Sequence, residues 1–143
     1  MSSYVPAELR RLVESRADGL CEYCLIHQDD TFTGCHVDHV ISEKHGGLTE
    51  LANLAIACAV CNRSKGSDVG SVTAAGLFCR FFNPRVDHWS DHFVLNGFRI
   101  VPRTEIGEVT SRILGFNTLD RLLEREELAL SGRYPSAAAL RRM

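Results

Sequence analysis

Two pairs of cysteines, each pair separated by two residues, enclose the part of this sequence with the most reactive side chains. They are Cys21 and Cys24, and Cys58 and Cys61. Thiolates are soft ligands, and four of them can close a tetrahedral zinc site with no open position, which is typical of a structural metal. The pattern therefore predicts one structural zinc ion. Two disulfide bonds or four unrelated buried cysteines are the alternatives, although paired spacings of this kind seldom arise by chance.

A second group of side chains, in and just beyond the 33 residues between the cysteine pairs, suits different chemistry. Asp38 offers a carboxylate and Asn62 an amide oxygen, which are the hard ligands that magnesium or manganese prefers. The imidazole of His39, with an ordinary pKa of about 6.5, can accept a proton from water at physiological pH. Asn53 would orient that imidazole through its amide or peptide oxygen. This set predicts hydrolysis of a phosphodiester bond, with a divalent ion stabilising charge on the leaving oxygen.

Two short strands are expected to hold these residues, over 36–41 and 54–58, with glycines 46–47 giving the loop between them its backbone freedom. In a regular strand, alternation would direct Asp38 and His39 to opposite faces. Both can serve one site only where the strand ends, bends or bulges.

A helix is expected to begin near Val60, directly after the second strand. On that helix Lys65 lies three residues after Asn62 and therefore on the same face. Lys65 is predicted to contact the scissile phosphate or a neighbouring one, with an exposed lysine of no function as the alternative. Another helix is expected over residues 6–17.

The second half of the chain reads as a connector, a hairpin and helices. The connector spans residues 66–76, and Asn96-Gly97 between apolar runs predicts a two-residue hairpin that extends the small sheet. A capped helix is expected to begin at Thr104 and run to about residue 114, and Asn117 is expected to cap a second helix over 118–130; both would serve as scaffold or as the surface of a homodimer. A dense aromatic group is expected mostly in the core: Phe78, Phe81, Phe82 and Trp89.

The order of the motifs resembles the HNH endonuclease family. The shared features are Cys-x-x-Cys, Asp-His-Val-Ile, Gly-Gly, Asn-Leu and Cys-x-x-Cys-Asn-x-x-Lys, over about a third of the chain. The resemblance implies a ββα-metal fold, in which two short strands and a helix surround one divalent ion. It also implies His39 as the general base, Asp38 and Asn62 as ligands of the catalytic ion, and Asn53 as the asparagine that supports the base. The four ligands of a structural zinc would be Cys21, Cys24, Cys58 and Cys61.

Two positions depart from the usual motif. Asn62 stands where histidine is often found and keeps an oxygen for the metal, and Ser42 replaces the proline that usually follows the first strand. The stretch FFNPRVDHWSDHFVLNGFRI also resembles the tail of a bacterial subgroup of stand-alone HNH proteins. The expected fold class is α+β, with one HNH endonuclease domain over residues 1–143. Its zinc-bound core would span 1–70, and its hairpin and helical extension 71–143.

Composition limits the class of protein. With 143 residues, 45% hydrophobic and 24% charged, the chain has the composition of a soluble globular protein, which excludes disordered and collagen-like classes. No secretory signal and no run of transmembrane length is found, so we expect a cytoplasmic protein with no membrane partner. A reducing cytoplasm would keep the thiols available for zinc.

The charge argues against strong DNA binding. The net charge is −2, and residues 1–65 hold six Lys and Arg against nine Asp and Glu. Proteins that depend on phosphate contacts usually carry a basic face. A bound catalytic ion recruits phosphate directly, however, so weak and salt-sensitive DNA affinity is expected.

Three functions fit these observations. The first is a metal-dependent HNH endonuclease that nicks or cuts DNA and leaves 3′-hydroxyl and 5′-phosphate ends, as the resemblance implies. The second is a zinc-containing DNA-binding module without catalysis. The third is a structural zinc protein that binds no DNA. The intact Asp38, His39 and Asn62 favour the first, whereas the acidic motif half favours the third.

Overall fold

The computed structural model describes residues 4–143 of the protein. The short apolar run over residues 54–58 forms one strand of its first sheet. Strands β1 (Cys35–His39) and β2 (Leu54–Cys58) pair antiparallel, with His39 opposite Leu54. Every residue of β2 is buried, as expected for a short strand with no polar side chain. The predicted second strand is confirmed, whereas the first begins one residue earlier and ends two residues earlier than expected.

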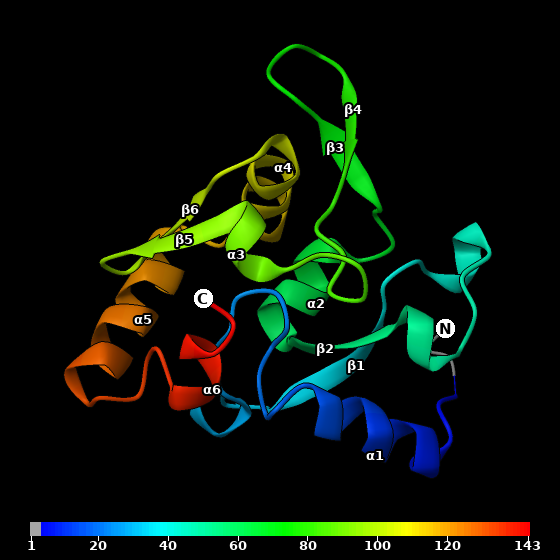
Figure 1. Ribbon diagram of the computed structural model, residues 1–143, viewed down its shortest axis with the longest axis horizontal. Helices are drawn as coiled ribbons and strands as arrows, with labels where there is room; N and C mark the ends of the chain where they lie inside the picture. The colour runs from blue at the N-terminus through cyan, green and yellow to red at the C-terminus, as the bar shows by residue number, and fades with distance from the viewer. Residues whose placement is uncertain (1–3) are drawn as a thin grey trace.

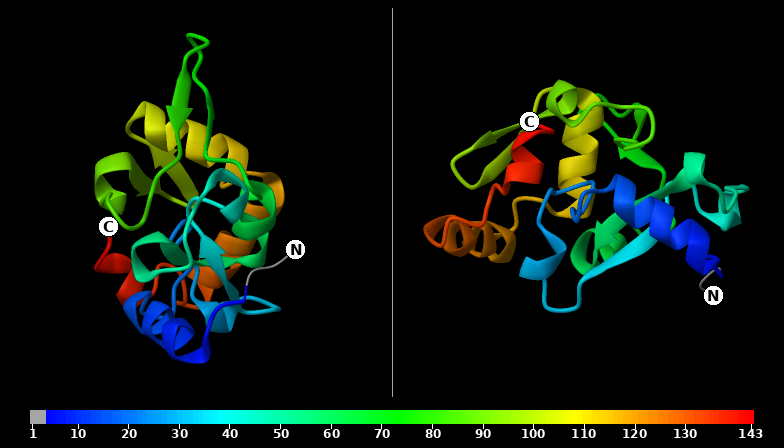
Figure 2. Two further views of the ribbon diagram at one scale, coloured as in Figure 1. Left: turned by 90° about the vertical axis from the view of Figure 1, so that its right-hand side faces the viewer. Right: turned by 60° about the horizontal axis from the view of Figure 1, so that its bottom comes forward.

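Two helices cover opposite sides of this strand pair (Figures 1 and 2). Helix α1 (Ala7–Arg16) packs its apolar side chains onto the strands, where Val13 meets Leu54 and Ile56 in a small separate core. Helix α2 (Ala59–Lys65) follows β2 without a loop, because the side chain of Cys58 caps its first turn by accepting from Cys61 N. The strand–strand–helix order expected from the sequence is therefore present.

The loop from residue 40 to 53 is closed by the side chain of Asn53. Its Oδ1 accepts from Ile41 N at 2.9 Å, and its Nδ2 donates to Ile41 O at 2.8 Å and Leu48 O at 2.9 Å. Gly47 lies so close to this junction that a Cβ atom there would stand 1.6 Å from Ile41 O. Only glycine fits at that position, which gives a steric reason for the Gly-Gly pair.

The second half of the chain contains two hairpins instead of the one predicted. Strands β3 (Gly70–Val72) and β4 (Phe78–Arg80) form a hairpin that projects from the body of the molecule (Figures 1 and 2). Strand β3 lies within the segment 66–76 that was expected to be a plain connector, and β4 follows it. Strands β5 (Phe93–Asn96) and β6 (Arg99–Pro102) pair only with each other. The prediction that the Asn96-Gly97 hairpin extends the first sheet is therefore wrong.

Four helices complete the structure. They are α3 (Trp89–His92), α4 (Glu105–Leu114), α5 (Leu119–Leu130) and α6 (Ala137–Leu140). Thr104 caps α4 as expected, by accepting from Gly107 N at 3.0 Å. The cap predicted at Asn117 is wrong, because that side chain bonds both Ile100 N and Ile100 O.

The main core lies between the cysteine-bearing loop and the C-terminal half of the chain. It includes three of the four aromatic residues expected there, whereas Phe78 on the projecting hairpin is 67% exposed. No helix within residues 4–143 is both long enough and apolar enough to cross a membrane. The described residues, 4–143, therefore combine helices with three small antiparallel sheets, the α+β class expected from the sequence.

Candidate functional site

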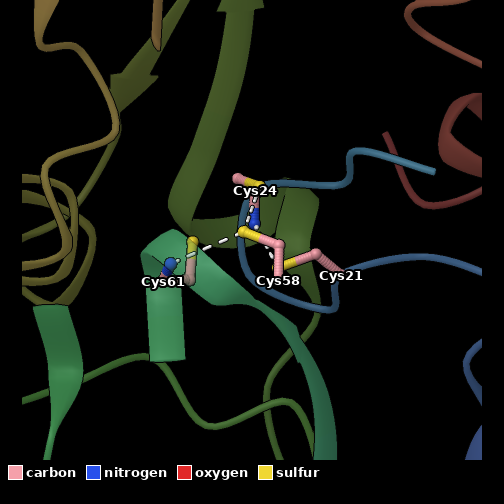
Figure 3. Close-up of side chains that lie close together, drawn as sticks. All are labelled: Cys21, Cys24, Cys58 and Cys61. Carbon is pink, nitrogen blue, oxygen red and sulfur yellow. Dashed lines mark hydrogen bonds between the residues drawn. The ribbon is translucent and has the colours of Figure 1, made fainter. Parts of the chain in front are cut away.

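The four predicted zinc ligands meet at one point. Cys21 and Cys24 lie on the loop after α1, Cys58 ends β2, and Cys61 lies in the first turn of α2 (Figure 3). Their sulfur atoms all lie within 4.8 Å of one another, and all four side chains are buried. All six cysteines of the chain are free thiols, so the two-disulfide alternative is wrong.

The geometry of the cluster suits a tetrahedral metal ion. Two sulfur atoms each bonded to zinc at about 2.3 Å lie about 3.8 Å apart across a tetrahedron, and the Cys24 and Cys58 sulfurs are 3.7 Å apart. Backbone N–H groups of Cys24 and Cys61 point at the sulfurs of Cys21 and Cys58, each at 3.5 Å. These N–H groups would stabilise thiolate charge, so the donor set fits a metal such as zinc.

The cysteine cluster is completed by a residue from the far end of the chain. Arg121 on α5 is 4% exposed and lies 3.0 Å from the Cys24 sulfur and 3.6 Å from the Cys58 sulfur. Hydrogen bonds from the other three thiols lower the pKa of Cys58, and the Arg121 charge acts in the same direction. Tyr134 also reaches this loop, donating to Cys24 O at 2.9 Å. The C-terminal extension is thus built into the cysteine site.

Three of the four residues predicted to act on a phosphodiester, all except Asn53, line a single pocket. Strand β1 ends at His39. The alternation that would direct Asp38 and His39 to opposite faces therefore stops at this point, and both residues line the same pocket. Together with Asn62 from α2 they line a cavity of about 560 Å³. Arg10 and Lys44 also line the cavity, as does Glu43, and the two cationic side chains suit an anionic ligand.

Asp38 is held by two buried neighbours. Tyr23 donates to its Oδ2 at 2.9 Å, and the ammonium of Lys65 lies 3.3 Å from Oδ1 and 3.2 Å from Oδ2. Burial raises the pKa of Asp38, while Lys65 and Tyr23 oppose that shift. A carboxylate has about four acceptor sites, and the hydrogen bonds from Tyr23 and Lys65 use two of them. Acceptor sites therefore remain for a ligand.

Lys65 has a different environment from the one expected. It is 2% exposed, and its ammonium also donates to His39 O at 3.0 Å. Lys65 and Asn62 lie on the same face of α2. This face packs against β1, and the Lys65 side chain is therefore buried. In this structure the ammonium neutralises Asp38, so it is not turned to solvent as a contact to substrate phosphate would be.

Donor and acceptor roles around His39 can be derived from one hydroxyl. Thr49 donates its only hydroxyl proton to Glu43 Oε1 at 3.1 Å. Its Oγ1, 2.9 Å from His39 Nε2, must therefore accept, and Nε2 carries the ring proton. Nδ1 is then the basic atom of the neutral ring. Loop residues Glu43 and Thr49 thus select the tautomer, a role that sequence analysis did not find because neither residue carries a motif signal.

Asn53 supports His39 only indirectly. Its amide oxygen accepts from Ile41 N, and its peptide oxygen accepts from Val40 N at 2.9 Å. Both oxygens are therefore used by the backbone after β1, and not by the imidazole as the sequence analysis expected. Asn53 fixes the loop that carries Thr49, and Thr49 in turn contacts His39.

Two further polar groups face the pocket. The side-chain amide of Asn62 is half-buried and has no hydrogen-bond partner within residues 4–143, so its oxygen is available to a ligand. The hydroxyl of Ser42 is buried and likewise lacks a partner among the described residues. Ser42 stands where the motif usually has proline, so here that position contributes a polar group to the pocket.

These features define an α+β protein in which a four-cysteine cluster lies beside a pocket with an Asp-His pair. Residues 21–68 match the family model described as HNH endonuclease. The resemblance is thereby confirmed for this segment, about a third of the chain, and it supports nuclease-type activity on nucleic acid. Neither a curated protein nor a solved structure matches the chain.

The cysteine cluster predicts about one tightly bound zinc ion per chain. Cys58→Ala should release it and lower the melting temperature, because zinc binding and folding are coupled. Cys79→Ala removes a thiol outside the cluster and should retain the metal. Elemental analysis and thermal melting of both variants test the prediction, and purified parent protein without zinc would contradict it.

Arg121 should slow the loss of zinc. Replacing Arg121 with Met removes two N–H groups directed at the sulfurs, and such outer partners are worth about 10- to 100-fold in metal affinity. We expect faster zinc transfer to a chromogenic chelator and an intermediate rate for Arg121→Lys. Arg112→Met, on the exposed side of α4, is the control. Equal transfer rates for the Arg121 and Arg112 variants would show that the arginine has no effect on the metal.

The buried Asp38–Lys65 pair should dominate local stability. Lys65→Met leaves a buried carboxylate without its cation and should cost about 3 to 5 kcal/mol. Adding Asp38→Asn to that variant removes the unpaired charge and should restore part of the loss. Urea unfolding of the zinc-bound proteins measures both effects. A Lys65→Met protein as stable as the parent would show that the pair contributes little.

Proposed function

We propose that the protein is a metal-dependent endonuclease that hydrolyses DNA phosphodiester bonds. The observation that carries the proposal is that β1 ends at His39, so that Asp38, His39 and Asn62 line one pocket. The HNH match over residues 21–68 supports the same conclusion. Arg10 and Lys44, which line the same pocket, suit a phosphate.

Each residue has a role that its contacts support. His39 Nδ1 accepts a proton from water, because Nε2–H is held by Thr49. Asp38 and Asn62 would hold magnesium or manganese, whose chemistry is to stabilise negative charge on the leaving oxygen. Tyr23 and Lys65 orient the Asp38 carboxylate, and Asn53 keeps the loop closed. Cys21, Cys24, Cys58 and Cys61 would hold zinc without taking part in hydrolysis.

The rest of the proposal concerns assembly and environment. Residues 1–143 act as one domain, which the contacts of Arg121 and Tyr134 with the cysteine loop support. A reducing cytoplasm fits six free thiols. Helix α5 leaves Leu119, Leu123 and Leu130 more than half exposed, which supports a homodimer through the C-terminal helices.

One observation favours a DNA-binding module without catalysis. The ammonium of Lys65 already neutralises Asp38, the residue proposed to hold the catalytic ion. If this pair excludes a divalent ion, the pocket binds a phosphate through Arg10 and Lys44 and cuts nothing. Incubating supercoiled plasmid with magnesium, manganese or no added ion separates the two functions. Relaxed or linear plasmid supports the endonuclease, and a gel shift alone supports the binding module.

His39→Ala should abolish cleavage without affecting the fold. Loss of a positioned general base lowers the rate by about a hundred- to ten-thousandfold, while zinc content and melting temperature should stay near those of the parent. Asn62→Ala acts through the ion, so raised magnesium should restore part of its activity but none to His39→Ala. Asp38→Ala also acts through the ion but leaves the Lys65 ammonium buried without its partner, so its activity is compared after correction for the folded fraction. His45→Ala is the control, because His45 is exposed on the loop over residues 40–53 that follows His39.

Cleavage rate and melting temperature are measured on the same preparations. A His39→Ala protein that cuts at the parental rate would remove His39 from the mechanism. If cleavage falls only in proportion to the folded fraction, His39 is a packing residue and the proposed mechanism is wrong.

A further inference from the structure

Three arginines from distant parts of the chain surround one buried carboxylate beside β2. Arg16 ends α1, Arg85 lies in the turn before α3, and Arg142 is the penultimate residue. The Glu22 side chain between them is fully buried; its Oε1 accepts from Arg85 Nη2 and lies 3.5 Å from Arg142 Nη1. Its Oε2 accepts from Ile56 N at 2.8 Å. We refer to Arg16, Arg85 and Arg142 with Glu22 as the arginine pocket.

These four residues line a cavity of about 430 Å³, larger than a phosphate group. The rest of its wall is apolar or small, from Ala52, Pro84 and Val86. Three guanidinium charges meet one carboxylate, which leaves two positive charges without a counter-charge inside the cavity. Asp18, 3.2 Å from Arg142, is half exposed at the margin and reduces this excess without removing it.

Several N–H groups of these arginines also lack an acceptor within the described residues. Arg85 has a 9% exposed side chain, yet its Nε and Nη1 have no hydrogen-bond partner within residues 4–143. The same holds for Arg16 Nε, whose Nη2 donates to Leu54 O at 2.6 Å. Three of the seven buried, unpartnered side-chain atoms in the described part of the chain thus belong to this one pocket. Because native structures pair nearly all such groups, these unpaired N–H groups on residues that line the cavity indicate a missing acceptor.

A purely structural role would not need this arrangement. One arginine is enough to neutralise Glu22, and each additional buried guanidinium costs desolvation that an unpartnered N–H does not return. A bound oxyanion would supply both the missing negative charge and the missing acceptors. The low-dielectric wall around the pocket would strengthen that attraction.

The arginine pocket is separate from the pocket of Asp38 and His39. Both backbone polar groups of Ile56 bond to Glu22, so in the antiparallel pair they face away from β1. The arginine pocket therefore lies at the outer edge of β2, whereas the other pocket is lined by β1. A ligand here cannot be the phosphate that is cut.

We propose that the arginine pocket binds a backbone phosphate of DNA at a point away from the scissile bond. This inference rests on the proposed nucleic-acid function and adds a second contact to it. The chain is acidic overall, so a phosphate contact must come from a local concentration of arginines. The pocket reads no base edge and confers affinity without sequence preference.

The test measures binding of a labelled DNA duplex by fluorescence anisotropy without divalent ion, across a range of salt concentrations. Each neutralised phosphate contributes about 0.9 to the slope of log affinity against log salt. Arg142→Gln and Arg16→Gln should each make the slope shallower by about that amount. Arg142→Lys keeps the charge and should keep the slope.

Arg99→Gln is the matched control, because it removes the same charge from an exposed residue at the start of β6. Zinc content and melting temperature show whether each variant is folded. Arg142→Gln and Arg16→Gln remove different arginines of the pocket, so either folded variant is enough for the test. A slope that is the same in the parent and in Arg142→Gln overturns the proposal, as does a parent protein that binds no DNA.

Two further arms separate this proposal from its alternatives. Stabilisation by inorganic phosphate that Arg142→Gln loses, with an unchanged DNA slope, identifies a free-anion site and overturns the DNA assignment. A protein that never cuts DNA but shows the expected change of slope leaves the arginine pocket standing while the endonuclease fails. Cleavage of DNA with an unchanged slope supports the endonuclease and overturns the proposal for the arginine pocket.

Discussion

Four thiol groups within 4.8 Å of one another are the constraint on which the rest of the structure depends. Buried thiolates repel one another, so they can share this space only if positive charge compensates them. A bound metal would supply most of that charge, and Arg121 adds a guanidinium at 3.0 Å from Cys24. The cluster holds the loop after α1 against the junction of β2 and α2.

That junction transmits the constraint to the candidate active site. Because β2 runs into α2 at Cys58 without a loop, fixing Cys58 and Cys61 fixes the first turn of α2. Asn62 follows directly, and Lys65 lies one turn later, where it reaches Asp38 across the interface with β1. The cysteines touch no part of the pocket, yet they determine which α2 residues face it. This separation is why cleavage and zinc binding can be tested by different substitutions.

Sequence reasoning succeeded where the information is local. Residue type and spacing identify the cysteine cluster, the second strand, and the Thr104 cap of α4. It failed where a contact joins distant segments. Asn117 is a good helix cap by type, but its amide pairs with the backbone of Ile100 seventeen residues away. No local pattern could show that Arg121 reaches the sulfurs, or that Lys65 is buried against Asp38.

The arrangement of charge explains how an acidic protein can engage a polyanion. Phosphate affinity depends on the charges within reach of each phosphate, since more distant exposed charges are screened over about 10 Å at moderate salt. Arg10 and Lys44 face one pocket, and three arginines face the other. Many of the acidic residues that set the net charge have no part in either pocket, and Glu22 is fully enclosed by the arginines it partly neutralises. The sum over the sequence is therefore a poor guide to binding, because α1, the turn at Arg85 and the chain end become neighbours only after folding.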